Sequence, residues 1–179
     1  MHLNQLITPE YQAANRALHE KRGGWGKSGR KYADEIMAFA HELGAQTILD
    51  YGCGRGTLRK ELCYKRHIPE VLYEWDPAIP KKNRRMPRPA DLVVCTDVLE
   101  HVEPDFLLNS LTHLDQLTRK GCYLAIATRP ANQLLPDGSN AHRIIEGGIW
   151  WLKEVARMPW TLLRSEEKLG HEIRIWLRR

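Results

Sequence analysis

The stretch "TILDYGCGRGTL", residues 47–58, decides which fold the chain is predicted to adopt. An apolar run ending in Asp50 leads into a turn in which Gly52, Gly54 and Gly56 alternate with other residues. Short apolar runs are typical of buried parallel strands, and glycines let the backbone approach a ligand closely. The stretch therefore predicts a strand, a ligand-binding turn and a short helix over residues 57–65.

The glycine spacing argues against two common nucleotide-binding loops. The dinucleotide fingerprint is G-x-G-x-x-G, but here Thr57 occupies the position of the third glycine. The segment "GGWGKSG", residues 23–29, lacks the glycine that a phosphate-binding loop needs five positions before Gly26, where Lys21 stands. The tight turn at 52–56 suits a ligand that lies against the backbone with an amine near Asp50. A nicotinamide-binding domain is the weaker alternative.

Outside this stretch, the sequence alternates predicted strands with predicted helices. The strands are expected at "EVLYEW", "DLVVCT" and "GCYLAIAT", and the helices at "PDFLLNSLTHLDQLTRK" and within "NAHRIIEGGIWWLKEVA". Near-continuous apolar runs favour a parallel sheet covered on both faces. Near the end of the chain Ile173, Ile175 and Leu177 alternate with charged residues, and Gly170 precedes them. We therefore expect an α/β fold with a mostly parallel sheet and a C-terminal antiparallel hairpin.

Length and composition favour a single globular domain over residues 1–179. Within it we expect N-terminal helices and a glycine-rich segment over 1–44, followed by the sheet over 45–179. No apolar run approaches the ~20 residues of a membrane span, and the N-terminus lacks the apolar segment of a secretory signal. The four cysteines form no C-x-x-C pair. These observations predict a cytoplasmic protein without a membrane partner, of unknown oligomeric state.

The formal net charge is +5, and part of the excess lies in "KKNRRMPR", residues 81–88. Such a segment is either a solvated loop or a contact for nucleic-acid phosphates. A charge of this size does not decide between them.

Three motifs in order resemble the class I S-adenosylmethionine-dependent methyltransferases. "ILDYGCGRG" resembles their first motif, "YEWDPAIP" their second strand with its ribose-binding acid, and "ADLVVCTDVLEHVEPD" their fourth motif. The resemblance implies a Rossmann-like fold and S-adenosylmethionine as the methyl donor, with S-adenosylhomocysteine as its product. The whole pattern is also similar to small methyltransferase domains of bacteriophages and prophages. The cofactor-binding residues that the resemblance implies are Asp50, Gly52, Gly54, Gly56, Asp76, Thr96 and Asp97.

One part of the family pattern is missing from the sequence. Only fourteen residues, mostly basic or proline, separate Asp76 from Asp91. A strand–helix unit does not fit in that length. We expect the family's third strand to be short or missing, which leaves the adenine-binding acid unassigned.

The methyl acceptor should lie beyond the ends of the third and fourth predicted strands. Asp97, His101 and His142 are the candidate catalytic groups there, and each histidine could equally be structural. The motifs of adenine, cytosine-nitrogen and cytosine-carbon methyltransferases are absent. We therefore expect methyl transfer to oxygen or nitrogen of a small-molecule or nucleotide-like acceptor.

Two alternatives to this function remain open. Asp97, Glu100, His101 and His142 are similar to the E-x-x-E-H pattern and later histidine of the small-RNA 3′-terminal 2′-O-methyltransferases, which implies metal-assisted methylation of an RNA terminus. "LEHV" also recurs in metal-free relatives, so a divalent metal is possible but not favoured. The other alternative is a partner protein that binds S-adenosylmethionine without catalysis.

Two segments that contain tryptophan suggest further roles. Trp25 could close over the cofactor as a lid, with Lys27 or Ser28 near the methionine carboxylate. Trp150 and Trp151 are adjacent, so on a helix only one of them can face the core.

Overall fold

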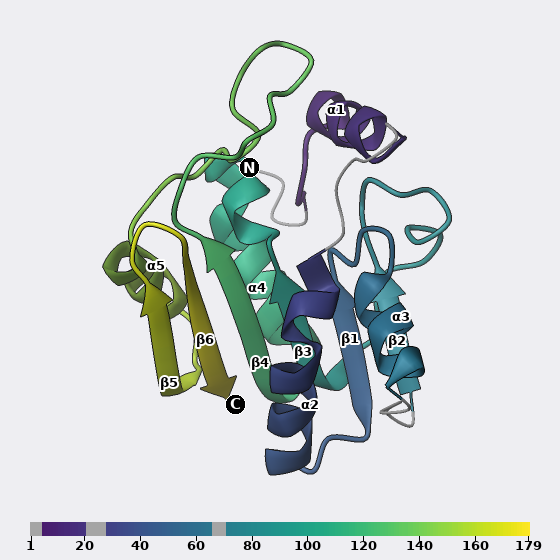
Figure 1. Cartoon of the computed structure of the whole chain (residues 1–179), viewed down its shortest axis with the longest axis vertical. Helices are drawn as coiled ribbons and strands as arrows, with labels where there is room; N and C mark the ends of the chain where they lie inside the picture. The colour runs from purple at the N-terminus through teal and green to yellow at the C-terminus, as the bar shows by residue number, and fades with distance from the viewer. Residues whose placement is uncertain (1–4, 21–27, 66–70) are drawn as a thin grey trace.

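A computed structural model describes residues 5–20, 28–65 and 71–179 (Figure 1). Its strands are β1 (Thr47–Tyr51), β2 (Val71–Trp75), β3 (Ala90–Thr96), β4 (Thr118–Ala127), β5 (Thr161–Lys168) and β6 (Glu172–Arg178). They form one six-stranded sheet in the order β2-β1-β3-β4-β6-β5. The first four strands are parallel, and β6 pairs antiparallel with β4 and β5. The predicted α/β fold with its terminal hairpin is confirmed.

Helices cover both faces of the sheet. Buried side chains of α2 (Ala33–Glu42) and α3 (Thr57–Tyr64) pack on one face, and those of α4 (Leu107–Leu117) and α5 (Gly148–Val155) pack on the other. Single 3₁₀ turns are η1 (Ser28–Tyr32), η2 (Leu99–His101) and η3 (Pro104–Phe106). The remaining helix, α1 (Pro9–Glu20), lies beyond the ends of the parallel strands (Figure 1).

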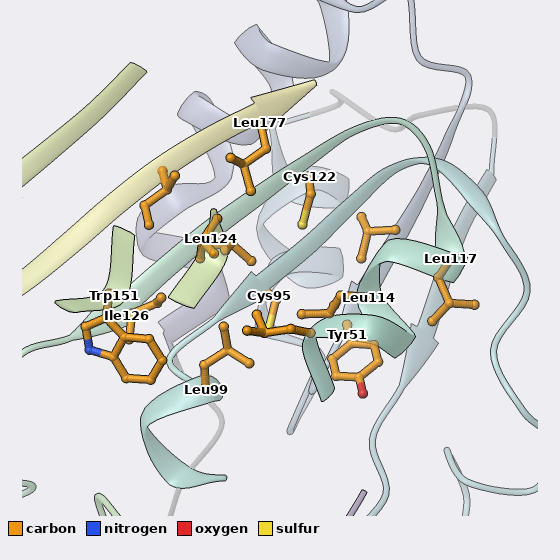
Figure 2. Packing of buried hydrophobic residues seen from close by; sticks show 14 of the residues in the cluster. Tyr51, Cys95, Leu99, Leu114, Leu117, Cys122, Leu124, Ile126, Trp151 and Leu177 are labelled. Carbon is orange, nitrogen blue, oxygen red and sulfur yellow. The ribbon is translucent and has the colours of Figure 1, made fainter. Parts of the chain in front are cut away.

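The core between the sheet and α4 is mostly apolar. Leu114 of α4 and Trp151 of α5 pack with Cys95 and Leu124 of the central strands (Figure 2). Burying one such side chain contributes roughly 1.5–3 kcal/mol. Trp151 is completely buried, whereas Trp150 is half-buried at the edge of this cluster. One tryptophan of the pair is thus core, as predicted.

The sheet ends at β2, as the short connection predicts. Residues 76–89, all of which the structure describes, form turns and loop but no strand or helix. The sheet edge at β2 therefore has no third strand beside it among the described residues.

The helix predicted over residues 104–120 is shorter in the structure, and the helix expected within residues 140–156 is found there as α5. Residues 118–120 belong to β4, and the Thr118 hydroxyl donates to the carbonyl of Leu114 as α4 ends. The amides of Arg143 and Ile144 donate to the carbonyl of Glu100, so α5 begins only at Gly148. None of the described helices has both the length and the apolar character needed to cross a bilayer.

Candidate functional site

A cavity of about 400 Å³ lies where the parallel strands end. The chain leaves β1 toward β2 on one side of the sheet, while β3 and β4 continue on the other side. Open α/β sheets bind ligands at such a switch point, beyond the carboxyl ends of the strands. Its walls fall into two parts. The glycine-loop half comprises Asp50, Gly52, Gly54 and Asp76, and the histidine half comprises Thr96, Asp97, Glu100, His101 and His142.

The glycine loop needs glycine for backbone reasons. Gly52, Gly54 and Gly56 all have positive φ, which L-residues rarely adopt. A Cβ on Gly52 would also collide with the Val98 side chain. Gly52 and Gly54 line the cavity, whereas Gly56 lies outside its lining, against Glu74 and Lys82 at the start of α3. The tight turn therefore places Gly52 and Gly54 at the cavity, and it places Gly56 against the Glu74–Lys82 ion pair outside the cavity.

Asp76 is held rigidly in the glycine-loop half. One carboxylate oxygen accepts a hydrogen bond from the Gly54 amide (2.9 Å), and the other accepts one from the Ala78 amide (2.9 Å). The side chain is buried, with 5% exposure, and still lines the cavity. The glycine loop and the loop after β2 are thus joined through this one carboxylate.

Asp50 is a buried acid in the same half of the cavity. It pairs in register with Glu74 of β2, so two carboxylates neighbour each other across the sheet. Burial, and next the charge of Glu74, raise the pKa of Asp50 to about 7, while Lys82 opposes that shift. Lys82 reaches in from the basic loop and pairs with Glu74 at 3.2 Å. A buried acid with a raised pKa is poised to receive a positively charged ligand group.

Asp97 turns the chain at the end of β3. Its φ of 52° is the only positive value for a non-glycine residue in the described chain, and its amide donates to Ala125. Burial raises the pKa of this carboxyl. A hydrogen bond from Ser28 lowers it, but the net shift is upward. Strained non-glycine residues of this kind concentrate at functional sites. Thr96, directly before it, is buried and also lines the cavity.

The two predicted catalytic histidines meet in the histidine half. The His101 and His142 rings lie 4.6 Å apart between centroids, edge to face. Each Nδ1 lies near a backbone carbonyl, that of Ala141 at 2.8 Å and that of Arg129 at 2.5 Å. A carbonyl can only accept, so both Nδ1 atoms carry the proton and both Nε2 atoms carry a lone pair. Burial lowers the pKa of His101 to about 3 and also lowers that of His142. Such a low pKa makes His101 a poor proton acceptor at neutral pH.

Glu100 is the buried acid of the histidine half. It is fully buried, and its Oε1 accepts a hydrogen bond from the Ala127 amide at 3.1 Å. Its Oε2 has no hydrogen-bond partner among the described residues. Ligand atoms of Glu100, His101 and His142 all lie within 4.8 Å of one another. Glu100 belongs to the 3₁₀ turn η2, and although it is fully buried it still lines the cavity.

Helix α1 contributes cavity residues to which the sequence analysis assigned no role. Tyr11, Asn15 and His19 line the cavity, and the buried Asn15 Oδ1 has no partner among the described residues. The Tyr11 hydroxyl donates to the carbonyl of His101 at 2.7 Å. No local signal in the sequence places α1 over the sheet.

Hydrogen bonds of Thr8 and Gln12 explain the position of α1. Thr8 caps the helix, accepting from the Tyr11 amide while its own hydroxyl and amide donate to Glu103. Gln12 donates to the carbonyl of Pro77 in the loop after β2. The helix thus bridges the two halves of the cavity. The proposed lid residues Trp25 and Lys27 lie outside the described residues, and Ser28 lines the cavity.

Comparison with known proteins places this geometry in a family. A family profile described as "Methyltransferase domain" matches residues 19–174. No curated protein sequence matches the chain. Among solved structures, magnesium protoporphyrin IX methyltransferase from Synechocystis, crystallised with bound S-adenosylmethionine, superposes with a TM-score of 0.64 at 14% identity, covering 98% of this chain and 100% of that one.

Two further structures are similar. A 1,6-didemethyltoxoflavin-N1-methyltransferase from Burkholderia thailandensis, holding its substrate and S-adenosylhomocysteine, has a TM-score of 0.61 at 19% identity, with 98% of this chain and 92% of that chain covered. An S-adenosylmethionine-dependent methyltransferase from Clostridium acetobutylicum has a TM-score of 0.61 at 14% identity, with 83% and 91% covered. These likenesses describe the fold, and the phage-like subtype stays a prediction. With the profile matching most of its length, the chain belongs to the methyltransferase-domain family.

Proposed function

We propose that the protein binds S-adenosylmethionine in the glycine-loop half and transfers its methyl group to oxygen or nitrogen of a small-molecule or nucleotide-like acceptor. The observation that carries this proposal is the convergence of Asp50, Asp76 and two positive-φ glycines on one cavity at the switch point of the sheet. The cavity volume of about 400 Å³ falls within the ~300–1,000 Å³ of ligand pockets.

The donor set of this half fits the methyl donor. Asp76 presents a carboxylate whose position two backbone amides determine, which suits a pair of ribose hydroxyls. Asp50 lies under the glycine turn, where a ligand ammonium would favour its charged form. Gly52 and Gly54 present backbone that a bulky ligand can approach. The bound sulfonium would supply an already activated methyl group.

The work left to the protein is to position the acceptor and take up its proton. Asp97, with its raised pKa, and His142 line the same cavity as the glycine turn. Helix α1 contacts both sides of the cavity, since Tyr11 donates to the His101 carbonyl and Gln12 donates to the Pro77 carbonyl. Holding donor and acceptor in line is the main source of acceleration in such a displacement.

Calorimetry with S-adenosylhomocysteine tests the cofactor site directly. We expect one binding site, and we expect Asp76→Ala to weaken binding at least about thirtyfold, because hydrogen bonds to a charged group contribute ~1.5–3 kcal/mol. Asp105→Ala, at an exposed aspartate outside the cavity, is the matched control and should bind like the wild type. Absence of binding to the folded wild-type protein would contradict the proposal.

Transfer is a separate measurement from binding. The protein is incubated with radiolabelled methyl donor and fractions of small metabolites, nucleotides and RNA. We expect label in a small-molecule or nucleotide fraction. Binding without transfer to any fraction would favour the non-catalytic partner protein.

The metal-assisted RNA-terminus reaction is the second candidate function. The observation that favours it is the grouping of Glu100, His101 and His142 within one part of the cavity. Label appearing only in the RNA fraction, and only at 3′ ends, would identify this reaction.

A further inference from the structure

Given the methyl transfer proposed above, we infer that the acceptor is a small acid whose carboxylate or phosphate binds Arg129, beside the histidine half of the cavity. An N–H or O–H group of the same molecule donates a hydrogen bond to Asn15 of α1. Both side chains line the cavity, one from the loop after β4 and the other from the helix above it. The cavity of about 400 Å³ also has to hold the methyl donor, which favours a small acceptor.

Asn15 presents a buried oxygen to the cavity. The side chain is 6% exposed and lines the cavity, and its Oδ1 has no hydrogen-bond partner among the described residues. A buried amide oxygen without a partner costs free energy, because it has given up its hydrogen bonds to water. A ligand that donates a hydrogen bond to Oδ1 removes this cost. Asn15 therefore favours acceptors that contain an N–H or O–H group.

The neighbouring tyrosine determines which way the Asn15 amide points. The Tyr11 hydroxyl donates its only proton to the His101 carbonyl at 2.7 Å, so its oxygen can only accept a second hydrogen bond. A side-chain hydrogen bond also joins Tyr11 to Asn15, and its donor must be the NH₂ group of Asn15. The Oδ1 atom therefore faces away from Tyr11. The same contacts place Asn15 beside the histidine half of the cavity.

Arg129 supplies a positive charge at the start of the loop after β4. Its carbonyl accepts a hydrogen bond from Nδ1 of His142 at 2.5 Å, so the arginine directly adjoins the histidine half. Within the described chain its guanidinium donates only to the carbonyl of Pro130, at 3.2 Å, whereas Arg164 and Arg174 form ion pairs with acids. A guanidinium has five N–H donors in a planar fork that matches a carboxylate or phosphate. Arg129 therefore has donors available for an anion.

The two acids of the histidine half do not neutralise this charge. Burial raises the pKa of both Asp97 and Glu100, which disfavours their charged forms. Arg129 opposes the shift at Glu100 but forms no ion pair with it. An anionic group of the acceptor would meet a positive charge here together with two acids whose ionisation is suppressed. The electrostatics of this part of the cavity therefore favour an acidic acceptor over a neutral or cationic one.

A transfer assay with a fractionated extract tests the class of acceptor. A cell extract is ultrafiltered, and the filtrate is divided on an anion exchanger into a retained, anionic pool and an unretained pool. Each pool, and the macromolecular retentate, is incubated with the full-length protein and radiolabelled S-adenosylmethionine. We expect label in the retained pool. Loss of the acceptor after phosphatase treatment of this pool would identify the anion as a phosphate, and resistance would identify a carboxylate.

Two variants test the contacts with the acceptor. We expect Arg129→Gln and Asn15→Leu each to lower the rate of transfer to the retained pool at least about tenfold, because each removes a hydrogen bond to the acceptor. Both should bind S-adenosylhomocysteine like the wild type, which also shows that they fold. Arg119→Gln is the matched control, since it removes an exposed arginine at the opposite end of β4, outside the cavity. Its transfer rate should equal that of the wild type.

The outcomes separate the acceptor class from the methyl transfer on which it depends. Label only in the unretained pool, or only in the macromolecular retentate, would overturn the acidic small-molecule acceptor and leave methyl transfer intact. Unchanged transfer by Arg129→Gln would overturn the anion contact, and unchanged transfer by Asn15→Leu would overturn the hydrogen bond. Weakened S-adenosylhomocysteine binding in a folded variant would assign that side chain to the methyl donor instead. Label in no fraction would contradict the proposed function itself.

Discussion

In the glycine-loop half of the cavity Asp76 satisfies both carboxylate oxygens with backbone amides, whereas in the histidine half Glu100 satisfies only one. Both side chains are buried to a similar degree. The difference shows that the position of the Asp76 carboxylate is fixed before any ligand arrives, whereas one Glu100 oxygen has no hydrogen-bond partner among the described residues, and burial raises the pKa of that carboxyl. Such preorganisation lowers the free-energy cost of binding the proposed methyl donor, S-adenosylmethionine.

The largest expected effect comes from Asp50→Asn, because Asp50 is the least stable charge in the glycine-loop half. Its pKa rises from 3.8 to about 7 in the folded protein, so folding takes up a proton between these values. The free energy of unfolding therefore falls as pH rises from about 4 to 7. We expect the variant to be more stable than wild type by about 2–4 kcal/mol above pH 7, with no advantage below about pH 4.

Urea unfolding at pH 4 and pH 8 measures this difference, with Asp105→Asn at an exposed site as control. We also expect Asp50→Asn to weaken S-adenosylhomocysteine binding about tenfold or more. Equal stability of variant and wild type at pH 8 would show that Asp50 carries no uncompensated charge.

The pH dependence of binding is the next largest effect. Below about pH 7 Asp50 is protonated and cannot pair with a ligand ammonium. We expect wild-type affinity for S-adenosylhomocysteine to rise about five- to tenfold from pH 6 to pH 7.5. The charged groups that act on Asp50 are Glu74, Lys82, Asp76 and Arg59. Calorimetry on Asp50→Asn should give a flatter profile, and an unchanged slope would assign the titration to another group.

A smaller effect is expected where α1 bridges the two halves. Tyr11→Phe removes the hydroxyl that donates to the His101 carbonyl but keeps the ring. We expect a loss of about 0.5–1.5 kcal/mol of stability and a few-fold faster release of S-adenosylhomocysteine. Stopped-flow fluorescence measures the release. Tyr64→Phe, at an exposed tyrosine of α3, is the control, and identical rates in both variants would remove α1 from ligand retention.

The smallest effect is expected in the basic loop. Lys81, Arg84, Arg85 and Arg88 are exposed, whereas Lys82 of the same loop pairs with Glu74 behind Asp50. Replacing the four exposed residues by Gln should change S-adenosylhomocysteine affinity less than twofold, because exposed charges are screened. Lys82→Gln should change it more. Calorimetry at about 0.15 M salt compares the two, and the reverse order would indicate that the exposed charges contact the ligand.

Elements with a strong local pattern were predictable from the sequence. The apolar run before Asp50 and the glycine trio identified β1 and its turn, and the alternation at Ile173, Ile175 and Leu177 identified β6. The missing third strand followed from length alone. The ends of α4 were wrong by several residues, because the chain enters β4 at Thr118, whose hydroxyl donates to the Leu114 carbonyl.

The sequence was sufficient to name several candidate cavity residues, among them the carboxylates of the glycine-loop half and both histidines of the other half. Their mutual arrangement depended on contacts between residues 40 to 95 positions apart, such as His101 with Ala141 and Thr8 with Glu103. Such contacts follow from how helices and loops pack on the sheet, and no periodic pattern encodes them. Packing buries Glu100, brings the rings of His101 and His142 together edge to face, and lays α1 across the cavity.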